Sequence, residues 1–357
     1  MLIVRSPVRI SFGGGGTDLP AYYEKFGGAV LSTSINKYFY TILQKRTDGK
    51  IQVISSDLRV METWQDISRM EIQRSELAIP LAAIKEIGSS VSVDLFLASE
   101  ISAGTGLGSS ASVCVGVLKT LAAYLDLPFS KYDLAEQAFR LARDILRKPV
   151  GKQDEYAAAF GGLNFITFNP DGSAWVEPVE LPVADLREFE NRLMLFFTGV
   201  SHDSWRLLHA QEQSTKQGDG QTVEALHQVR QLADLMRVAL RKRDFRVFGA
   251  LLHDAWEAKK RVSSLISTPL IDEAYALARA NGSLGGKVTG AGGGGFLLLF
   301  CEPQQQAAVR EAVATLGLRE MAFGLDHQGA QVVTNDPFID SDEKCGMRWT
   351  FAPALTY

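Results

Sequence analysis

The glycine- and serine-rich run from Ser102 to Ala111 constrains this chain more than any other feature. It follows a segment at 91–98 whose apolar residues alternate, as in a strand with one buried face. It precedes a segment at 110–125 whose apolar residues recur at helical spacing. Glycines let backbone N–H groups turn toward an anion, and a helix N-terminus carries unpaired N–H groups and partial positive charge. The run therefore predicts a phosphate-binding loop at the start of a buried helix.

The spacing of the glycines excludes the two commonest nucleotide loops. Gly104, Gly106 and Gly108 are separated by one residue each, which does not fit GxGxxG, and no lysine follows as GxxxxGK[ST] requires. Ser109 and Ser110 stand at the entrance of the predicted helix. Their hydroxyls suit two roles, capping of the helix or, at Ser110, contact with a Mg²⁺ ion.

Two more glycine clusters lie far from the first, at 13–16 and 285–295. Each adjoins a predicted strand, at 8–12 and 296–301 respectively. One such cluster is adequately explained as a plain turn. Three of them beside strands favour the close approach of a ligand to the backbone, which only glycine permits freely.

The composition narrows the classes of protein to consider. The chain has 357 residues, 46% of them hydrophobic, and a formal net charge of −4, so it shows no basic excess and we expect no nucleic-acid partner. Its three cysteines are far apart and its histidines lack ligand spacing, which argues against a disulfide framework and a structural metal. We find neither a signal-peptide pattern nor an apolar window of the ~20 residues that a span needs, so we expect no membrane association and a cytoplasmic location.

The order of the elements indicates an α+β protein, because strands and helices mix without strict alternation. The polar run at 209–222 is expected to be an exposed, mobile loop.

We divide the chain into residues 1–185, 186–333 and a tail at 334–357 that wraps back on the body or stays loose. Further strands are predicted at 29–44, 163–168 and 192–198, and further helices at 131–147, 223–239 (with helical character continuing through 256), 271–280 and 304–316.

The three glycine-rich motifs together resemble those of one enzyme family. Residues 104–111 resemble the GLGSSA phosphate loop of the GHMP kinases, and 287–295 resemble their C-terminal glycine motif. The strings 6–9 and 15–18 resemble the N-terminal substrate motif of the sugar-kinase branch, and 151–162 resembles the heptose-phosphate kinases within it. The resemblance implies a ribosomal S5 domain 2-like N-terminal domain and a ferredoxin-like C-terminal domain.

The same resemblance implies what the chain does and with which residues. It implies phosphorylation of a hydroxyl on a sugar or sugar phosphate, with ATP and Mg²⁺ as cofactors. Asp154 would be the catalytic base, with Arg9 as a second catalytic residue beside it. A homodimer is one expected oligomeric state. Phosphoryl transfer needs held phosphates, a metal and a group that accepts the hydroxyl proton. The ATP-binding residues would be Gly104, Thr105, Gly106, Leu107, Gly108, Ser109 and Ser110, with Ser110 also on the metal. The substrate-binding residues would be Gly15, Thr17, Asp18, Gly292 and Gly293.

Each of the charged residues also has a purely structural interpretation. Asp154 would otherwise be an exposed or capping carboxylate, and Asp18 an N-cap for a helix that begins near residues 19–20. Arg9 would pair with Asp154, either as a structural ion pair or while stabilising the transferring phosphoryl group. Lys287 would be an anion contact or a solvated lysine.

Two positions depart from the pattern of the family. The glutamate that usually adds to the metal site falls on Ala142, so Asp144, Glu136 or only phosphates and water would complete the site. The basic residue expected after 198–199 falls near His202, with Arg206 as a second candidate for a sugar phosphate and Trp205 as a stacking or rim residue.

Three other functions therefore stay open. They are a kinase for another sugar such as a free hexose, a kinase for a non-sugar alcohol such as mevalonate or homoserine, and a nucleotide-binding regulator without catalysis.

Overall fold

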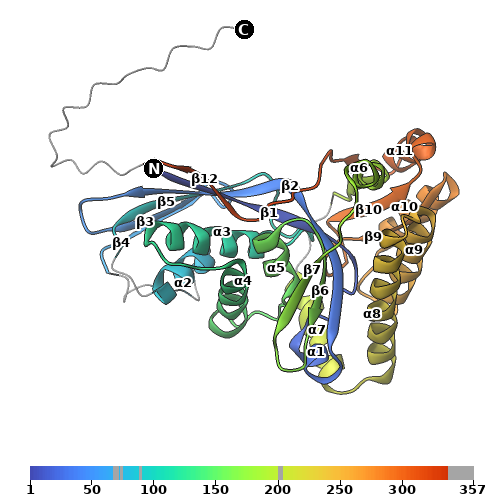
Figure 1. Ribbon diagram of the computed structural model, residues 1–357, viewed down its shortest axis with the longest axis horizontal. Helices are drawn as coiled ribbons and strands as arrows, with labels where there is room; N and C mark the ends of the chain where they lie inside the picture. The colour runs from blue at the N-terminus through green and yellow to red at the C-terminus, as the bar shows by residue number, and fades with distance from the viewer. Residues whose placement is uncertain (67–71, 73–74, 88–90, 200–203, 337–357) are drawn as a thin grey trace, which may run out of the picture.

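The structure is a computed structural model that describes residues 1–66, 72, 75–87, 91–199 and 204–336 (Figure 1). Two antiparallel-rich sheets lie next to each other, each covered by its own helices. The strands are β1 (Leu2–Gly13), β2 (Gly28–Lys45), β3 (Ile51–Ser55), β4 (Val60–Trp64), β5 (Val93–Ser99), β6 (Leu163–Phe168), β7 (Ala174–Pro178), β8 (Leu193–Phe197), β9 (Ser283–Val288), β10 (Phe296–Cys301), β11 (Arg319–Glu320) and β12 (Gln331–Asn335). The helices are α1 (Pro20–Phe26), α2 (Ala78–Ile87), α3 (Ser109–Tyr124), α4 (Lys131–Arg140), α5 (Gln153–Phe160), α6 (Val183–Glu190), α7 (Ser204–Lys216), α8 (Gly220–Arg241), α9 (Phe245–Lys260), α10 (Pro269–Ala280) and α11 (Gln306–Ala314).

The larger sheet has the strand order β12-β1-β2-β5-β3-β4, and β6 and β7 branch from β2. The branch is possible because β2 is 18 residues long. Its first part, from Gly28 to Thr33, pairs with β6, and its second part, from Phe39 to Lys45, pairs with β5. Only β3 and β5 run parallel within the described sheet. The smaller sheet has the order β11-β8-β10-β9 and is antiparallel throughout its described strands.

Helix α3 packs across β1 and β2 with α2, α4 and α5 around it (Figure 1). Its apolar stripe is the reason: Val117 and Leu121 are fully buried in the same core cluster as Leu95 and Leu97 of β5. The strand, glycine loop and helix predicted around residues 102–111 are confirmed. The loop therefore stands at a rigid boundary, where a buried strand ends and a buried helix begins.

The smaller sheet is covered by α9 and α10, and α8 packs on α9 and on β1 and β2 of the larger sheet (Figure 1). Phe248 and Leu252 of α9 are fully buried together with Leu298 of β10 and Phe12 of β1. Because Phe12 belongs to the larger sheet, this core joins the two sheets. The mixed α+β class is confirmed.

The prediction of an exposed loop at 209–222 is wrong. Residues 204–216 form α7, and α8 begins at Gly220. The buried face of α7 is polar: Gln211, Glu212 and Thr215 are 5%, 3% and 2% exposed. A helix whose buried face is polar shows no hydrophobic periodicity, so the sequence pattern did not reveal it.

Two other boundaries were predicted imprecisely. The predicted helix at 131–147 is α4 followed by a π-helical turn at Leu141–Ile145. The tail begins by wrapping back, because β12 pairs with β1 as far as Asn335. The rest of the tail, 337–357, lies outside the described residues.

Candidate active site

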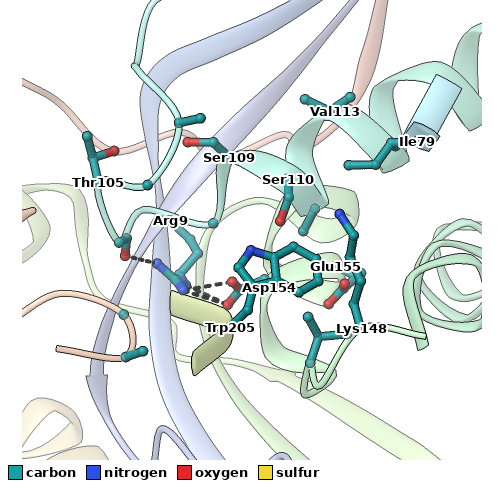
Figure 2. Close-up of a pocket in the computed structure, with 18 of the residues that line it drawn as sticks. Arg9, Ile79, Thr105, Ser109, Ser110, Val113, Lys148, Asp154, Glu155 and Trp205 are labelled. Atoms are coloured by element: carbon teal, nitrogen blue, oxygen red, sulfur yellow. Dashed lines mark hydrogen bonds and ion pairs between the residues drawn. The ribbon is translucent and has the colours of Figure 1, made fainter. Parts of the chain in front are cut away.

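A cavity of about 320 Å³ touches all three glycine clusters. Gly15 and Gly16 line it from the first cluster, residues 103–106 and 108–111 from the second, and Gly290 with Ala291 from the third. Figure 2 shows Ile79 and Val113 on one side of the cavity and Arg9 with Asp154 on another. We call the part lined by Ile79 and Val113 the apolar end, and the part lined by Arg9 and Asp154 the polar end. The apolar lining also includes Phe39, Leu58, Leu77, Pro80, Leu97 and Ile101, and the charged lining also includes Asp18, Asp57, Glu76, Lys148, Glu155 and Lys259. The three clusters thus meet at one cavity, and their role as ligand contacts stays a prediction.

The central loop has the backbone that an anion site requires. Gly104, Gly106 and Gly108 have φ values of 73°, 78° and 77°, in the left-handed region that glycine tolerates best. A side chain at Gly106 would also lie 2.5 Å from the carbonyl oxygen of Thr289, so the loop packs directly on the C-terminal glycine segment. Helix α3 starts with Gly108 as its N-cap, and no side chain caps it. Its first N–H groups are thus left for a ligand.

The two serines at the start of α3 differ in their surroundings. Ser109 Oγ is buried and has no hydrogen-bond partner among the described residues. Ser110 is exposed and lines the cavity (Figure 2). Neither caps the helix, so the capping interpretation is wrong. Both hydroxyls stand where the phosphates of a nucleotide at this helix terminus would lie, and they fit such a group.

Arg9 and Asp154 form a two-pronged ion pair at the polar end (Figure 2). Arg9 Nε and Nη2 donate to the two carboxylate oxygens of Asp154 at 2.7 and 2.8 Å. Arg9 Nη1 donates to the carbonyl oxygen of Gly106 at 2.5 Å, which ties the pair to the phosphate loop. Arg9 is 4% exposed, whereas the Asp154 side chain is 27% exposed and reaches the cavity. A carboxylate held by one fork of a buried guanidinium has a fixed orientation.

Asp18 joins the first glycine loop to the helix that carries Asp154. Its carboxylate accepts hydrogen bonds from the backbone N–H of Gly16 at 2.8 Å and from the backbone N–H and side-chain amide of Gln153 at 3.2 Å each. The N-cap of α1 is Leu19, so the capping interpretation of Asp18 is wrong. Burial, reinforced by the charge of Asp154, raises the pKa of Asp18 above its ordinary value. Asp18 is 3% exposed yet borders the cavity, as a substrate contact requires.

Two buried lysines add positive charge around this end. Lys259 Nζ donates to the carbonyl oxygen of Gly15 at 3.0 Å and to Gln211 Oε1 at 3.2 Å. Burial lowers the pKa of Lys259 to about 8, although Asp18 opposes the shift. Lys287 is 5% exposed, so the solvated alternative is wrong, and burial with the charges of Lys259 and Arg9 lowers its pKa to about 7. Such a cationic environment favours an anionic ligand.

Sequence reasoning assigned no role to many residues that line this cavity, among them Lys148, Gln153, Glu155 and Lys259. Glu155 is 2% exposed, and burial followed by the charge of Asp154 raises its pKa well above the ordinary value. Lys259 continues the buried stripe of Leu252, Ala255 and Trp256 on α9. A lysine at an apolar position of an amphipathic helix was a usable signal. Glu155 carried no signal beyond its place next to Asp154.

Some of the predicted residues lie beside the cavity rather than on its surface. Thr17 is fully buried, and its hydroxyl donates to the carbonyl oxygens of Gly14 and Ala29 at 2.8 and 3.0 Å, so it holds the first glycine loop in shape. Leu107 is a core residue. Gly292 and Gly293 do not border the cavity, whereas their neighbours Gly290 and Ala291 do.

The region expected to meet a sugar phosphate is only partly described. His202 lies outside the described residues. Arg206 is exposed and does not border the cavity. Trp205 does border it, and the ammonium of Lys148 lies 3.8 Å from the centre of its ring, so one ring face already carries a cation (Figure 2).

The acidic residues considered for the metal do not gather here. Glu136 accepts hydrogen bonds from Lys152 Nζ at 2.7 Å and from Tyr156 Oη at 2.5 Å, and it does not border the cavity. Asp144 lines a separate hollow with Arg143 and Lys216. Among the described residues, no group of three or more His, Cys, Asp or Glu side chains could hold a metal ion. A metal at this site would therefore need oxygens from a bound nucleotide.

The fold and the comparisons with known proteins define a GHMP kinase, a phosphotransferase that uses ATP as the phosphate donor. The family model for the GHMP kinases N terminal domain matches residues 77–162, and the model for the GHMP kinases C terminal matches residues 236–317. The chain belongs to this family. None of its described helices is long and apolar enough to cross a membrane.

Individual relatives narrow the likeness further. The chain is 33% identical to D-glycero-alpha-D-manno-heptose 7-phosphate kinase of Campylobacter jejuni over 85% of its length and 90% of that protein. It is 25% identical to L-fucokinase/L-fucose-1-P guanylyltransferase of Bacteroides fragilis over 86% of its length and 35% of that protein. The crystal structure of a D-glycero-D-manno-heptose 1-phosphate kinase from Bacteroides thetaiotaomicron has a TM-score of 0.78 and 27% identity, and the match covers 94% of this chain and all of that one.

Proposed function

We propose that this protein transfers the γ-phosphoryl group of ATP to a hydroxyl of a sugar phosphate, D-glycero-D-manno-heptose 7-phosphate at its anomeric position. The observation that supports it most is the place of Asp154, which faces the cavity between the phosphate loop and the loop of Gly15 and Gly16. The heptose phosphates in the names of two relatives support the substrate class.

In this reaction the two ends of the cavity have different ligands. The adenine base occupies the apolar end, and the phosphates lie against the N–H groups at the start of α3. The acceptor lies between Asp18 and Lys259, where a carboxylate accepts from sugar hydroxyls and a buried ammonium suits a substrate phosphate. Ser110 would contribute an oxygen to a bound Mg²⁺, and that ion would neutralise charge on the phosphates.

Asp154 acts as the general base. As the acceptor oxygen bonds to the γ-phosphorus, the bond to the bridging oxygen of ADP breaks and the hydroxyl proton passes to the carboxylate of Asp154. Arg9 holds this carboxylate in orientation and, through its contact with Gly106, keeps a positive charge next to the phosphate loop. The products are ADP and the doubly phosphorylated sugar.

A substrate panel tests the proposal. The purified protein is incubated with Mg-ATP and, separately, heptose 7-phosphate, unphosphorylated heptose, free hexoses, mevalonate and homoserine, and ADP release is measured. We expect the largest kcat/KM with heptose 7-phosphate, and a new anomeric phosphate signal in the ³¹P NMR spectrum of the product. Preferred turnover of a free hexose or of mevalonate would refute the substrate, and nucleotide binding without turnover of any acceptor would refute the activity.

A further inference from the structure

Glu155 is a buried carboxylate without a complete set of partners. It is 2% exposed, and its Oε2 atom accepts no hydrogen bond from any described residue. No described cation forms an ion pair with it, since Arg9 pairs with Asp154 and Lys152 pairs with Glu136. A buried carboxyl oxygen without a hydrogen bond costs free energy of folding, so we expect a bound ligand to supply its partner. Glu155 also borders the cavity, which gives a ligand access to it.

Helix α5, which carries Glu155, packs against α3. The charge of Glu155 also helps burial to raise the pKa of the Cys114 thiol on α3. Cys114 and Ser110 are four residues apart on α3 and therefore share a face of that helix. Figure 2 shows Glu155, Ser110 and Asp154 around the same hollow. Glu155 thus lies on the side of the cavity where the exposed hydroxyl of Ser110 meets the helix terminus.

The chemistry of this arrangement selects the missing partner. Burial and the charge of Asp154 favour the neutral acid of Glu155, and a cation beside it would favour the ionised form. The ionised carboxylate accepts but does not donate, so its partner is a cation or a donor. The nearby cation Lys148 is directed at the ring of Trp205 and forms no ion pair with Glu155. The helix terminus attracts phosphates, and Mg²⁺ characteristically binds nucleotide phosphates with one or two carboxylates and several waters.

We propose that Glu155 is the protein carboxylate that binds the divalent cation of the metal–nucleotide complex, together with the hydroxyl of Ser110. The inference rests on the proposed function, because the phosphates complete the metal site. Glu136 and Asp144 are excluded from this role by their positions away from the cavity. Asp154 stays with Arg9 and is left for the acceptor proton.

Binding of Mn²⁺ tests the role of Glu155 without reference to turnover. Mn²⁺ is titrated into the protein saturated with a non-hydrolysable ATP analogue, and free Mn²⁺ is followed by electron paramagnetic resonance. We expect Glu155→Gln, which keeps the shape and the hydrogen bonds of a neutral acid, to weaken Mn²⁺ binding by about tenfold or more. The same variant should bind the metal-free analogue at least as tightly as wild type, because it removes a negative charge near the phosphates. Asp144→Asn, an equal change of charge outside the cavity, should alter neither affinity.

Three results separate the possible failures. Unchanged Mn²⁺ binding by Glu155→Gln would overturn the role of Glu155, while failure of wild type to bind the analogue would overturn the proposed function. If Glu155→Gln does not fold, wild-type crystals with Mn²⁺ and the analogue decide, since the anomalous signal of the metal locates it. A peak within bonding distance of a Glu155 oxygen, about 2.2 Å, supports the proposal, and a metal bound only by Ser110, phosphates and water refutes it.

Discussion

Replacement of Asp154 by asparagine separates the catalytic and the structural contributions of the Arg9–Asp154 pair. Asparagine keeps the size of the side chain and one oxygen that accepts from Arg9, but it cannot take the proton of the acceptor hydroxyl. The proposed mechanism therefore predicts a large loss of kcat. The KM for ATP should change little, because asparagine keeps the size of the side chain beside Gly108 and leaves the apolar lining proposed for adenine unchanged.

The size of each effect follows from the geometry. A positioned general base contributes about 10²–10⁴-fold, or roughly 3–5 kcal/mol of activation free energy. Breaking a fully buried ion pair destabilises a protein by about 3–5 kcal/mol, because the remaining charge is left unpaired. Arg9 is 4% exposed, but the Asp154 side chain is 27% exposed and one hydrogen bond remains. We therefore expect a loss of only about 2 kcal/mol in the free energy of unfolding.

The assay combines ADP release under saturating substrates with urea unfolding, and Asp144→Asn serves as the matched control. We expect Asp154→Asn to stay folded with kcat reduced by about 10³-fold. The double variant Arg9→Met with Asp154→Asn should regain stability, since no buried charge is left unpaired, but it should regain no activity. Folded Asp154→Asn protein with kcat within about tenfold of wild type would refute the assignment of the base.

Three further predictions address the glycine loop and the lysines. Gly106→Ala should lower the free energy of unfolding by about 1–3 kcal/mol more than the control Gly172→Ala, and it should raise KM for ATP. Both glycines have positive φ, but only at Gly106 would an added Cβ lie against Thr289. Equal losses of stability in urea unfolding would contradict this prediction. Lys259→Met should raise KM for heptose 7-phosphate by roughly 10–100-fold and change KM for ATP little, and an equal effect on unphosphorylated heptose would argue against a phosphate contact. Lys287 has a pKa of about 7 when folded and about 10.4 when unfolded, so the unfolded chain holds more protons between these values and stability rises with pH across that range. Lys287→Met should flatten this rise and be more stable than wild type below about pH 7, whereas an unchanged slope in urea unfolding against pH would show that Lys287 stays charged.

Sequence patterns predicted correctly those elements whose conformation depends on neighbouring residues alone. The alternation at 91–98 and the helical spacing at 110–125 correspond to β5 and α3, and the glycines between them have the positive φ values expected of a turning loop. These features arise from periodicities of two and 3.6 residues and from steric limits at single positions. The glycine motifs were likewise sufficient to identify the family.

The same reasoning failed where burial and pairing depend on distant parts of the chain. Helix α7 buries polar side chains, among them Glu212, which accepts a hydrogen bond from Arg143 at 3.0 Å. Such a helix has no apolar stripe to detect, because its partners rather than its own sequence make burial favourable. The metal candidates Glu136 and Asp144 were plausible by position in the sequence, but their side chains turn away from the cavity.

The sequence by itself thus determined the class of enzyme and the loop for the phosphate donor, since both are written in contiguous residues. The tertiary structure decided which charges meet. Arg9 and Asp154 are 145 positions apart, and their pairing depends on β1 and α5 packing on the same helix, α3. The exposure of Ser110, the unpartnered oxygen of Glu155 and the buried ammonium of Lys259 likewise follow from packing. Electrostatic interaction depends on distance and burial, and neither can be read from spacing along a chain.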